Sequence, residues 1–373
     1  MEVTVKTTEL SDVLRLVRPV TEKKTTIPIL GTVLLTAERN RLLVTGTDLE
    51  TGAICPCPAT VRKPGKIAIP AQRLHEYVKV LPEGELELKA QASNWLSLTC
   101  HRSRSRIAGL AAASYPELPE PPDQKLTVRC GILARLAEQV LFAISTDDSR
   151  QELSGALLKI DKSGITMVAT DGHRLSFAQH RVDIEGLDSL LESVIPKKAL
   201  ADFLRFAEGL YTQDMEFSYT GNHLFFEWSN RRLLSRTGSG KFPSYERILP
   251  KAHPSAFTAD RDELLASIER VSRFSDARTQ QIIFDIGKGK CTLLGAQSDV
   301  GESEESFTVA HHGDSVRIGL KASYLSDFLD RTEFKNVRFS FHDANTAVEL
   351  QPNSAEMAAT HRYVVMPMLI AAK

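Results

Sequence analysis

Three groups of residues have types that suit chemistry, and the first resembles part of a phosphate-binding loop. Residues 238–241 read Gly-Ser-Gly-Lys. In nucleotide-binding loops the lysine is followed by Ser or Thr, whose hydroxyl binds magnesium. The motif also has a first glycine separated by four residues from the glycine before the lysine. Phe242 follows the lysine here and that spacing is missing. We therefore do not expect nucleotide binding.

The second group is Thr-Asp-Gly-His-Arg at residues 170–174. Asp171 and His173 are types that act as general acid or base, and a hydrolase that uses this pair is one alternative. No nucleophile motif accompanies them, so the segment is better interpreted as a turn that lines a binding pocket. Turnover of a substrate with no partner present would favour the enzyme.

The third group contains the residue types that bind metals. His311 and His312 have no carboxylate or cysteine at ligand spacing, and Cys55 and Cys57 form a C-x-C pair without a second pair to complete a zinc site. We predict no metal and no cofactor. The total of five cysteines is odd, and reduced thiols in a cytoplasmic protein are the expected state.

The composition is that of an ordinary globular chain with room for several cores. Of 373 residues 42% are hydrophobic and 25% charged, and the formal net charge is −1, from 46 basic and 47 acidic residues. This balance, taken alone, argues against binding of nucleic acid through bulk positive charge, but it allows charges sorted onto different faces. The apolar runs are far shorter than the ~20 residues of a membrane-spanning helix, and the N-terminus reads as a strand and not as a signal peptide.

The elements that must position any site occur three times. A strand followed by an amphipathic helix is predicted at residues 4–17, 126–140 and 256–268. Matching points lie about 125–130 residues apart, the size of one compact domain. Each copy then has a second strand–helix–strand segment, at residues 66–88, 194–217 and 316–341. A unit repeated three times indicates an architecture before it indicates a single catalytic site.

Between its two helices each copy has two apolar segments joined by a short loop with Asn or Gly, which is typical of a β-hairpin. The hairpins are predicted at residues 33–44, 157–168 and 283–293. Two amphipathic helices on an antiparallel sheet make an α+β unit.

Proline-rich linkers divide the three copies. They lie at residues 116–122 and 250–254, and prolines stiffen such linkers. We therefore predict domains at residues 1–122, 125–250 and 255–373.

The polar faces of the predicted helices lean basic in all three copies. Acidic residues gather elsewhere, for example Glu302, Glu304 and Glu305, which we place in a loop. On a single helix this is an ordinary solvated face, but its repetition favours a positive surface if the helices share one side. A DNA backbone, contacted without regard to sequence, is then a partner to test.

Five strings of residues occur in an order and spacing that point to one family. They are Ile-Pro-Ile-Leu-Gly at 27–31, Thr-Gly-Thr-Asp-Leu-Glu at 45–50, Val-Ala-Thr-Asp-Gly-His-Arg-Leu at 168–175, Phe-Pro-Ser-Tyr and Ile-Leu-Pro within 242–250, and Tyr-Val-Val-Met-Pro-Met at 363–368. Over essentially its whole length the chain resembles the bacterial sliding clamp family, the beta subunit of the replicative DNA polymerase III.

The resemblance implies a head-to-tail homodimer, a ring of six DNA-clamp domains with helices lining a central hole and antiparallel sheets outside. Duplex DNA would be held topologically, so a net charge near zero is no obstacle. The protein would be a cytoplasmic processivity factor without catalysis of its own. Its partners would be duplex DNA, a second copy of itself, the replicative polymerase, the clamp loader, and other polymerases and repair proteins that carry a clamp-binding motif, with no membrane.

The resemblance also implies three groups of site residues. The DNA-facing basic residues are Lys24, Arg73, Lys79, Arg150 and Lys198. A pocket between the second and third domains, which would accept a short apolar peptide motif, is lined by Leu153, Thr170, Gly172, His173, Arg174, Leu175, Pro243, Ile248, Val364, Val365, Met366, Pro367 and Met368. Candidates for the dimer interface are Ile107 and Phe274.

A monomeric peptide-binding adaptor that never meets DNA is the remaining alternative. The mass in solution separates the two, because a clamp would be a dimer of two 41.3 kDa chains. Retention on circular but not on linear DNA would identify a topological clamp.

Overall fold

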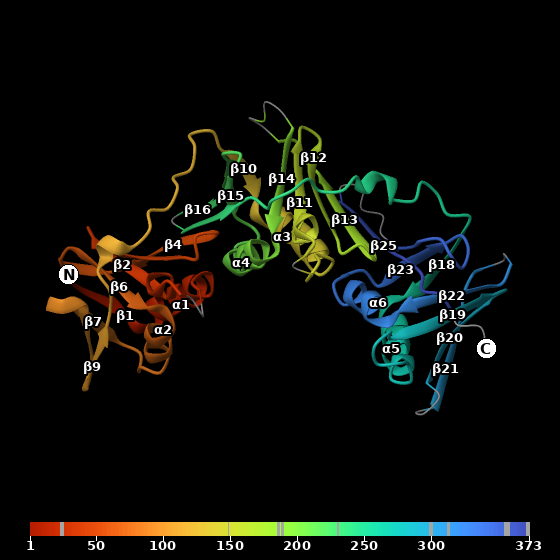
Figure 1. Cartoon of the computed structure of the whole chain (residues 1–373), viewed down its shortest axis with the longest axis horizontal. Helices are drawn as coiled ribbons and strands as arrows, with labels where there is room; N and C mark the ends of the chain where they lie inside the picture. Colours follow the sequence, from red (N-terminus) through yellow and green to blue (C-terminus); the bar gives the residue numbers. More distant parts are fainter. Residues whose placement is uncertain are drawn as a thin grey trace. The chain divides into compact units, whose positions relative to one another are not determined.

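The computed structural model of the chain describes residues 1–22, 26–147, 149–184, 187, 190–229, 231–297, 301–311, 314–353 and 359–370. Three copies of one α+β unit follow one another, as the sequence predicts, and Figure 1 labels their elements. Each copy runs strand, helix, three strands, strand, helix, three strands, and the first copy adds the short strand β5 (Thr60–Lys63).

The bounds of the elements are as follows. The first copy contains β1 (Glu2–Lys6), α1 (Thr7–Val17), β2 (Thr32–Glu38), β3 (Arg41–Thr47), β4 (Thr51–Pro58), β5, β6 (Gly65–Pro70), α2 (Ala71–Lys79), β7 (Glu85–Ala90), β8 (Trp95–Cys100) and β9 (Ser103–Ala108). The second contains β10 (Leu126–Arg129), α3 (Cys130–Leu141), β11 (Gly155–Asp161), β12 (Gly164–Thr170), β13 (Arg174–Arg181), β14 (Leu191–Pro196), α4 (Lys197–Ala207), β15 (Asp214–Tyr219), β16 (His223–Trp228) and β17 (Arg231–Arg236). The third contains β18 (Ser255–Asp260), α5 (Arg261–Ser272), β19 (Gln281–Gly287), β20 (Lys290–Gln297), β21 (Gly301–Thr308), β22 (Val316–Lys321), α6 (Ala322–Leu329), β23 (Asn336–Phe341), β24 (Val348–Pro352) and β25 (Ala359–Val365).

Four antiparallel sheets divide between two compact units. The first unit, Met1–Ala134 with Lys198–Thr237, holds the sheets β5-β1-β7-β8-β9 and β10-β15-β16-β17-β4-β3-β2-β6. The second unit, Arg135–Lys197 with Gly238–Lys373, holds β14-β11-β12-β13-β25-β24-β23-β18 and β21-β20-β19-β22. Each eight-stranded sheet therefore joins strands of two consecutive copies, through the pair β17–β4 in the first unit and β13–β25 in the second.

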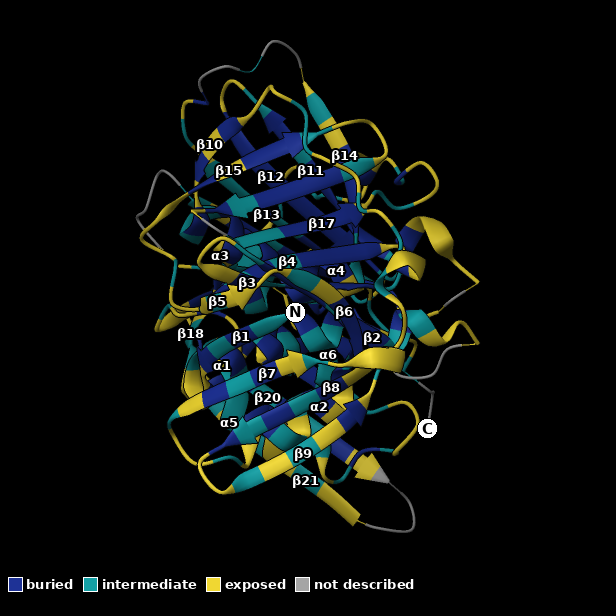
Figure 2. Cartoon of the chain, turned by 90° about the vertical axis from the view of Figure 1, so that its left-hand side faces the viewer, coloured by how far each residue is buried: buried dark blue, intermediate teal, exposed yellow. Residues whose placement is uncertain are grey.

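The three predicted hairpins are confirmed. Leu35 lies opposite Val44 in the pair β2–β3, and Leu157 lies opposite Val168 in the pair β11–β12. The third hairpin pairs β19 with β20. Figure 2 shows β12 in dark blue, and all seven of its residues are buried. A strand buried on both faces is an almost continuous apolar run, as this one is.

The structure adds a third strand to each hairpin, which the sequence interpretation missed. In the first copy this strand is β4, whose Pro56 and Pro58 argue against a central strand. The prolines are tolerated because β17 pairs with β4 only from Thr51 to Ile54, so one side of the strand is open where the prolines lie.

The acidic segment of the third copy is a strand and not the predicted loop. Glu302, Glu304 and Glu305 lie on β21, which pairs with β20 along its whole length and ends its sheet. The error has a physical cause, because charged residues are common on edge strands, where they discourage unwanted pairing.

The helices of the first and third copies pack in pairs on the sheets. Helix α1 lies beside α2, and α5 lies beside α6, as Figure 1 shows. Helix α5 begins where the Asp260 carboxylate accepts hydrogen bonds from the backbone N–H groups of Asp262 and Glu263, an N-cap that satisfies otherwise unpaired donors.

Each unit has its own aromatic core. In the first unit Phe203 stacks on Trp228 with ring centroids 5.8 Å apart. In the second unit Phe339 stacks with Phe257 at 4.9 Å and with Phe284 at 5.1 Å. These side chains are buried, so each unit has a core that can hold a surface site in place.

Candidate peptide pocket and DNA-facing residues

The turn at residues 170–174 connects β12 to β13 and is closed by its own side chains. The Asp171 carboxylate accepts hydrogen bonds from the backbone N–H groups of His173 (2.9 Å) and Arg174 (3.0 Å). The Thr170 hydroxyl donates to the Arg174 carbonyl (2.6 Å) and accepts from the Gly172 N–H (3.1 Å). Gly172 has a φ of 88°, which a glycine adopts without strain. The predicted turn is therefore confirmed, and the Asp171 carboxylate stabilises it through these hydrogen bonds.

The same turn occurs at residues 47–51 of the first copy. The Asp48 carboxylate accepts from the N–H groups of Glu50 (3.0 Å) and Thr51 (2.6 Å), and the Thr47 hydroxyl donates to the Thr51 carbonyl (2.8 Å). Leu49 has a positive φ of 76°, at the place that Gly172 occupies in the second copy. The turn is thus a feature of the repeated unit, and side chains alone distinguish its two described examples.

Strand pairing brings the C-terminal segment to the turn of the second copy. In the β13–β25 pair Arg174 lies opposite Val365 and Leu175 opposite Val364. Beyond the pair, the Met366 N–H donates to the His173 carbonyl at 2.9 Å. Residues about 190 positions apart therefore share one surface.

An apolar cluster lies beside this junction. Its buried members are Leu157, Val168, Leu175, Val194, Phe242, Tyr245 and Val364, and Phe177, Leu249 and Ala347 pack against it. Two apolar side chains next to the cluster in sequence are exposed: Met366 by 45% and Ile248 by 41%. A buried apolar floor with exposed apolar neighbours suits an apolar peptide.

The remaining predicted pocket residues lie around these elements. Leu153 is buried in the 3-10 turn Gln151–Leu153. Pro243 is half-buried beside Phe242. Pro367 is half-buried, and the Met368 N–H donates to the Gly319 carbonyl of β22 at 2.8 Å, which anchors the C-terminal segment.

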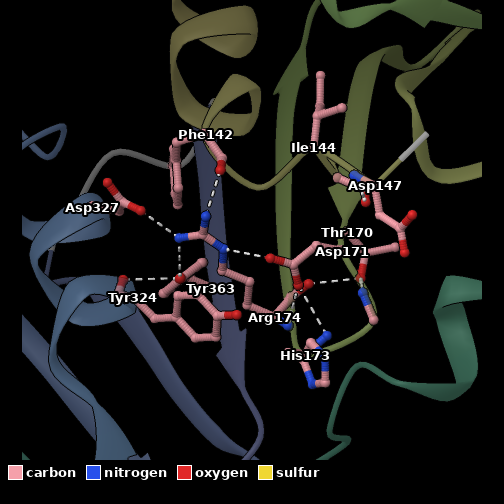
Figure 3. Close-up of polar contacts among 12 residues, drawn as sticks. Phe142, Ile144, Asp147, Thr170, Asp171, His173, Arg174, Tyr324, Asp327 and Tyr363 are labelled. Carbon is pink, nitrogen blue, oxygen red and sulfur yellow. Dashed lines mark hydrogen bonds and ion pairs between the residues drawn. The ribbon is translucent and has the colours of Figure 1, made fainter. Parts of the chain in front are cut away.

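Arg174 differs from its neighbours because its guanidinium is committed to the protein. Figure 3 shows it between Asp171 and Asp327. Nε donates to Asp171 (3.0 Å) and Nη1 to Asp327 (2.6 Å), while Nη2 donates to the Phe142 carbonyl (2.7 Å). The guanidinium also lies over the ring of Tyr324, 4.3 Å from its centroid.

The environment of Arg174 favours its charged form. Burial opposes the charge, but the neighbouring Tyr363 and Asp327 outweigh burial and raise the pKa of Arg174. Burial also lowers the pKa of Lys197, with Arg174 as the next cause, and the Lys197 ammonium donates to the Ile144 carbonyl at 3.1 Å.

Two predicted DNA-facing residues lie on one exposed helix. Arg73 and Lys79 are exposed on α2. Burial, followed by the charges of Arg18 and Lys79, lowers the pKa of His75 on the same helix. Arg18 and Lys79 therefore lie close enough to act on His75, although Glu76 of the same helix acts in the opposite direction. Lys24 lies outside the described residues.

The other two predicted DNA-facing residues are already engaged. The Lys198 ammonium donates to the Val20 carbonyl at 3.0 Å and forms an ion pair with Asp48 of the first-copy turn. Arg150 lies against the second-copy turn, where its Nη1 donates to the Asp171 carbonyl at 3.4 Å.

The predicted interface residues lie on or near two edge strands, and Ile107 is buried within its own chain, with 5% exposed. Ile107 lies on β9, the last strand of its sheet. Phe274 lies 3.7 Å from where a side chain at Gly301, the first residue of β21, would begin. β21 is also the last strand of its sheet.

The segments first singled out for chemistry have structural roles in the described residues. Residues 238–241 are followed by an irregular segment and not by the helix that a phosphate loop needs. The ring of His311, which is buried, hydrogen-bonds to the Asp314 carbonyl at 3.2 Å. Within the described ranges no three His, Cys, Asp or Glu side chains are grouped to hold a metal, and no helix is long and apolar enough to cross a membrane.

Sequence reasoning did not find the residues that hold Arg174. Asp327 and Tyr324 on α6 are three positions apart, so they share one face of the helix. Phe142 comes directly after α3. The spacing predicts that the two residues share a helix face, but it does not predict that this face contacts the turn at 170–174.

Three like copies joined through their sheet edges form the DNA-clamp fold. Family models of the DNA polymerase III beta subunit match nearly the whole chain, with the N-terminal domain at residues 1–119, the central domain at 127–244 and the C-terminal domain at 246–369. The chain belongs to the bacterial beta sliding clamp family, the beta subunits of DNA polymerase III.

Relatives and solved structures agree over the full length. The beta sliding clamp of Pseudomonas aeruginosa is 30% identical over 373 residues, with 99% of this chain and 100% of the relative covered. That of Caulobacter vibrioides is 29% identical over 378 residues, with the same coverage. The crystal structure of the Pseudomonas aeruginosa beta subunit matches with a TM-score of 0.92 at 28% identity, covering 99% of this chain and 100% of the other. The Pseudomonas aeruginosa clamp bound to griselimycin matches with a TM-score of 0.93 at 28% identity and the same coverage.

Proposed function

We propose that two copies of this chain close head to tail into a ring around duplex DNA and tether the replicative polymerase, the clamp loader and other DNA-processing proteins through the pocket at β13 and β25. The chain would act without catalysis of its own. We also propose domain boundaries at residues 1–122, 125–250 and 255–373, which the three family-model matches support.

The observation that carries the ring is the position and charge of two edge strands. On β9 the side chains of Arg104 and Arg106 are exposed and, two residues apart, share one face. On β21 Glu302 and Glu304 do the same. Figure 2 shows exposed, yellow segments on both strands. Antiparallel pairing of β9 with the β21 of a second copy would set opposite charges against each other and cover both edges.

Charge reversal tests this interface. Changing Arg104 and Arg106 to Glu should weaken the dimer, measured by sedimentation, because like charges would then face each other. Adding Glu302→Arg and Glu304→Arg in the same chain should restore it. A fourfold variant no more dimeric than the double variant would rule out this pairing.

The ring would hold DNA by enclosure, with weak contacts from the helices. Exposed Arg73 and Lys79 on α2 support a positive surface that touches phosphates without reading bases. The decisive experiment loads the dimer onto nicked circular DNA and onto the same DNA linearised. Retention on the circle and loss from free ends supports a topological clamp, whereas equal retention would indicate ordinary binding.

The pocket would bind partners through an apolar motif. The buried cluster with exposed Met366 and Ile248 supports this role, since methionine adapts to different apolar partners. Leu175 and Val364 would form its floor, and His173 would lie at its edge. We expect roughly micromolar affinity, about 8 kcal/mol, which suits partners that must exchange.

A further inference from the structure

We infer that Arg174 is a positioning residue of the pocket and not a ligand of the partner peptide: its guanidinium ties the turn at 170–174 to helix α6, so that the packing of α6 sets the shape of the pocket. This inference rests on the proposed function, because it assigns a role within the peptide site.

The first observation is a count of donors. A guanidinium has five N–H groups. Those of Arg174 face Asp171, Asp327, the Phe142 carbonyl and, at 3.5 Å, the Tyr363 hydroxyl. The side chain is only 10% exposed. Four of the five donors are thus committed inside the second unit, and a peptide would have to break one of these hydrogen bonds to use more than one.

The second observation is that the turn does not need an arginine to form. In the first copy Thr51 occupies the place of Arg174, and the backbone hydrogen bonds of the turn are the same. There the second oxygen of Asp48 pairs with Lys198. In the second copy Asp171 instead holds Arg174, which reaches on to Asp327. The guanidinium therefore adds a link to α6 and not the turn itself.

The third observation connects that link to the pocket. The turn presents the His173 carbonyl, which accepts the N–H of Met366, the exposed apolar residue of the site. From the α6 side, the Tyr324 carbonyl accepts the Tyr363 hydroxyl at 2.9 Å, and Tyr363 stacks on Phe328 with centroids 5.1 Å apart. Helix α6 thus holds both strands that frame the pocket: β13 through Arg174 and β25 through Tyr363.

The test substitutes a residue that is outside the predicted pocket. Asp327→Asn keeps the size of the side chain and removes the charge that Arg174 meets. It should weaken binding of a fluorescent apolar-motif peptide by about 2- to 30-fold, the range for residues that act through a network. The matched control is Asp285→Asn, which breaks the exposed Asp285–Arg317 pair of the same unit and should leave peptide affinity unchanged.

Two further variants separate positioning from a general loss of stability. Arg174→Lys keeps the charge but cannot bridge two carboxylates and a carbonyl, so it should weaken binding as Asp327→Asn does. In an Arg174→Met background, Asp327→Asn should have no further effect on affinity, because both changes break one link. Independent structural losses would add instead.

Each outcome has a distinct meaning. If the unsubstituted chain binds the peptide and Asp327→Asn binds it equally well, Arg174 does not transmit the position of α6 and the inference is overturned. It is also overturned if the two changes add. If the unsubstituted chain binds no such peptide, the proposed function of the pocket is overturned first, and this inference with it.

Discussion

Met366→Ala measures directly how much of the proposed peptide site is already built in the free chain. The Met366 side chain is 45% exposed, and that part is the surface a peptide would cover. Full burial of a methionine contributes about 1.5–3 kcal/mol, so covering this fraction contributes about 0.7–1.4 kcal/mol. We expect the variant to bind peptide about 1 kcal/mol more weakly, roughly fivefold in Kd.

The neighbouring Ile248 provides a second, independent measurement. It is 41% exposed, which gives about 0.6–1.2 kcal/mol by the same reasoning. If Ile248 and Met366 contact different parts of the peptide, their effects add, and the double alanine variant should lose about 2 kcal/mol, roughly thirtyfold in Kd.

Fluorescence anisotropy with a labelled apolar-motif peptide is a suitable assay. The buried half of Met366 already stabilises the free chain, so Met366→Ala should also lower the free energy of unfolding by about 1 kcal/mol, and titrations belong well below Tm. Val80→Ala is the control, since Val80 is 77% exposed at the end of α2 in the other unit. A Kd for Met366→Ala within the error of the unsubstituted chain, or an equal loss in Val80→Ala, would refute the reasoning.

Three other expectations concern different surfaces. Asp48→Asn keeps the oxygen that accepts the hydrogen bonds of the turn but removes the charge that holds Lys198. The released lysine should steepen the slope of log DNA affinity against log salt concentration by about one unit, and an unchanged slope would mean that Lys198 does not face DNA. Phe274→Asp should shift the dimer to monomers in sedimentation, and an intact dimer would remove Phe274 from the interface. Burial lowers the pKa of His361 to about 3. As the pH falls below about 6.5, His361 therefore takes up a proton in the unfolded chain but not in the folded one. The free energy of unfolding should fall below that pH and should not depend on His361 above it. His361→Gln should remove about 2 kcal/mol of the loss between pH 7.5 and 5 in urea unfolding, and an identical pH dependence in both proteins would contradict this.

The sequence predicted the elements whose pattern is local. The hairpins of the three copies were found because each consists of two apolar segments joined by a short loop with Asn or Gly. Strand β4 was missed because Pro56 argues against a strand, and only the limited pairing with β17 makes the proline tolerable. Strand β21 was read as a loop because Glu302 and its neighbours are charged, whereas the edge position explains the charge.

The candidate site shows the same limit. The turn at 170–174 follows from its own Thr, Asp and Gly, so its form could be predicted. The direction of the Arg174 side chain could not, because it depends on Asp327 and Phe142, which the chain brings close only after it has folded. A motif fixes which residues are present, but tertiary packing decides which of them face a partner.

The burial of the five cysteines makes this chain convenient for labelling. All five lie within the described residues as buried free thiols, and burial raises the pKa of Cys55 and Cys57 to about 12. Only a thiolate reacts readily with maleimides or with another sulfur. The native cysteines should therefore not react with such reagents while the chain is folded. A single cysteine introduced on β9 and another on β21 would then be the reactive pair. A disulfide between them would show that β9 of one copy lies beside β21 of another, and no native cysteine would have to be removed.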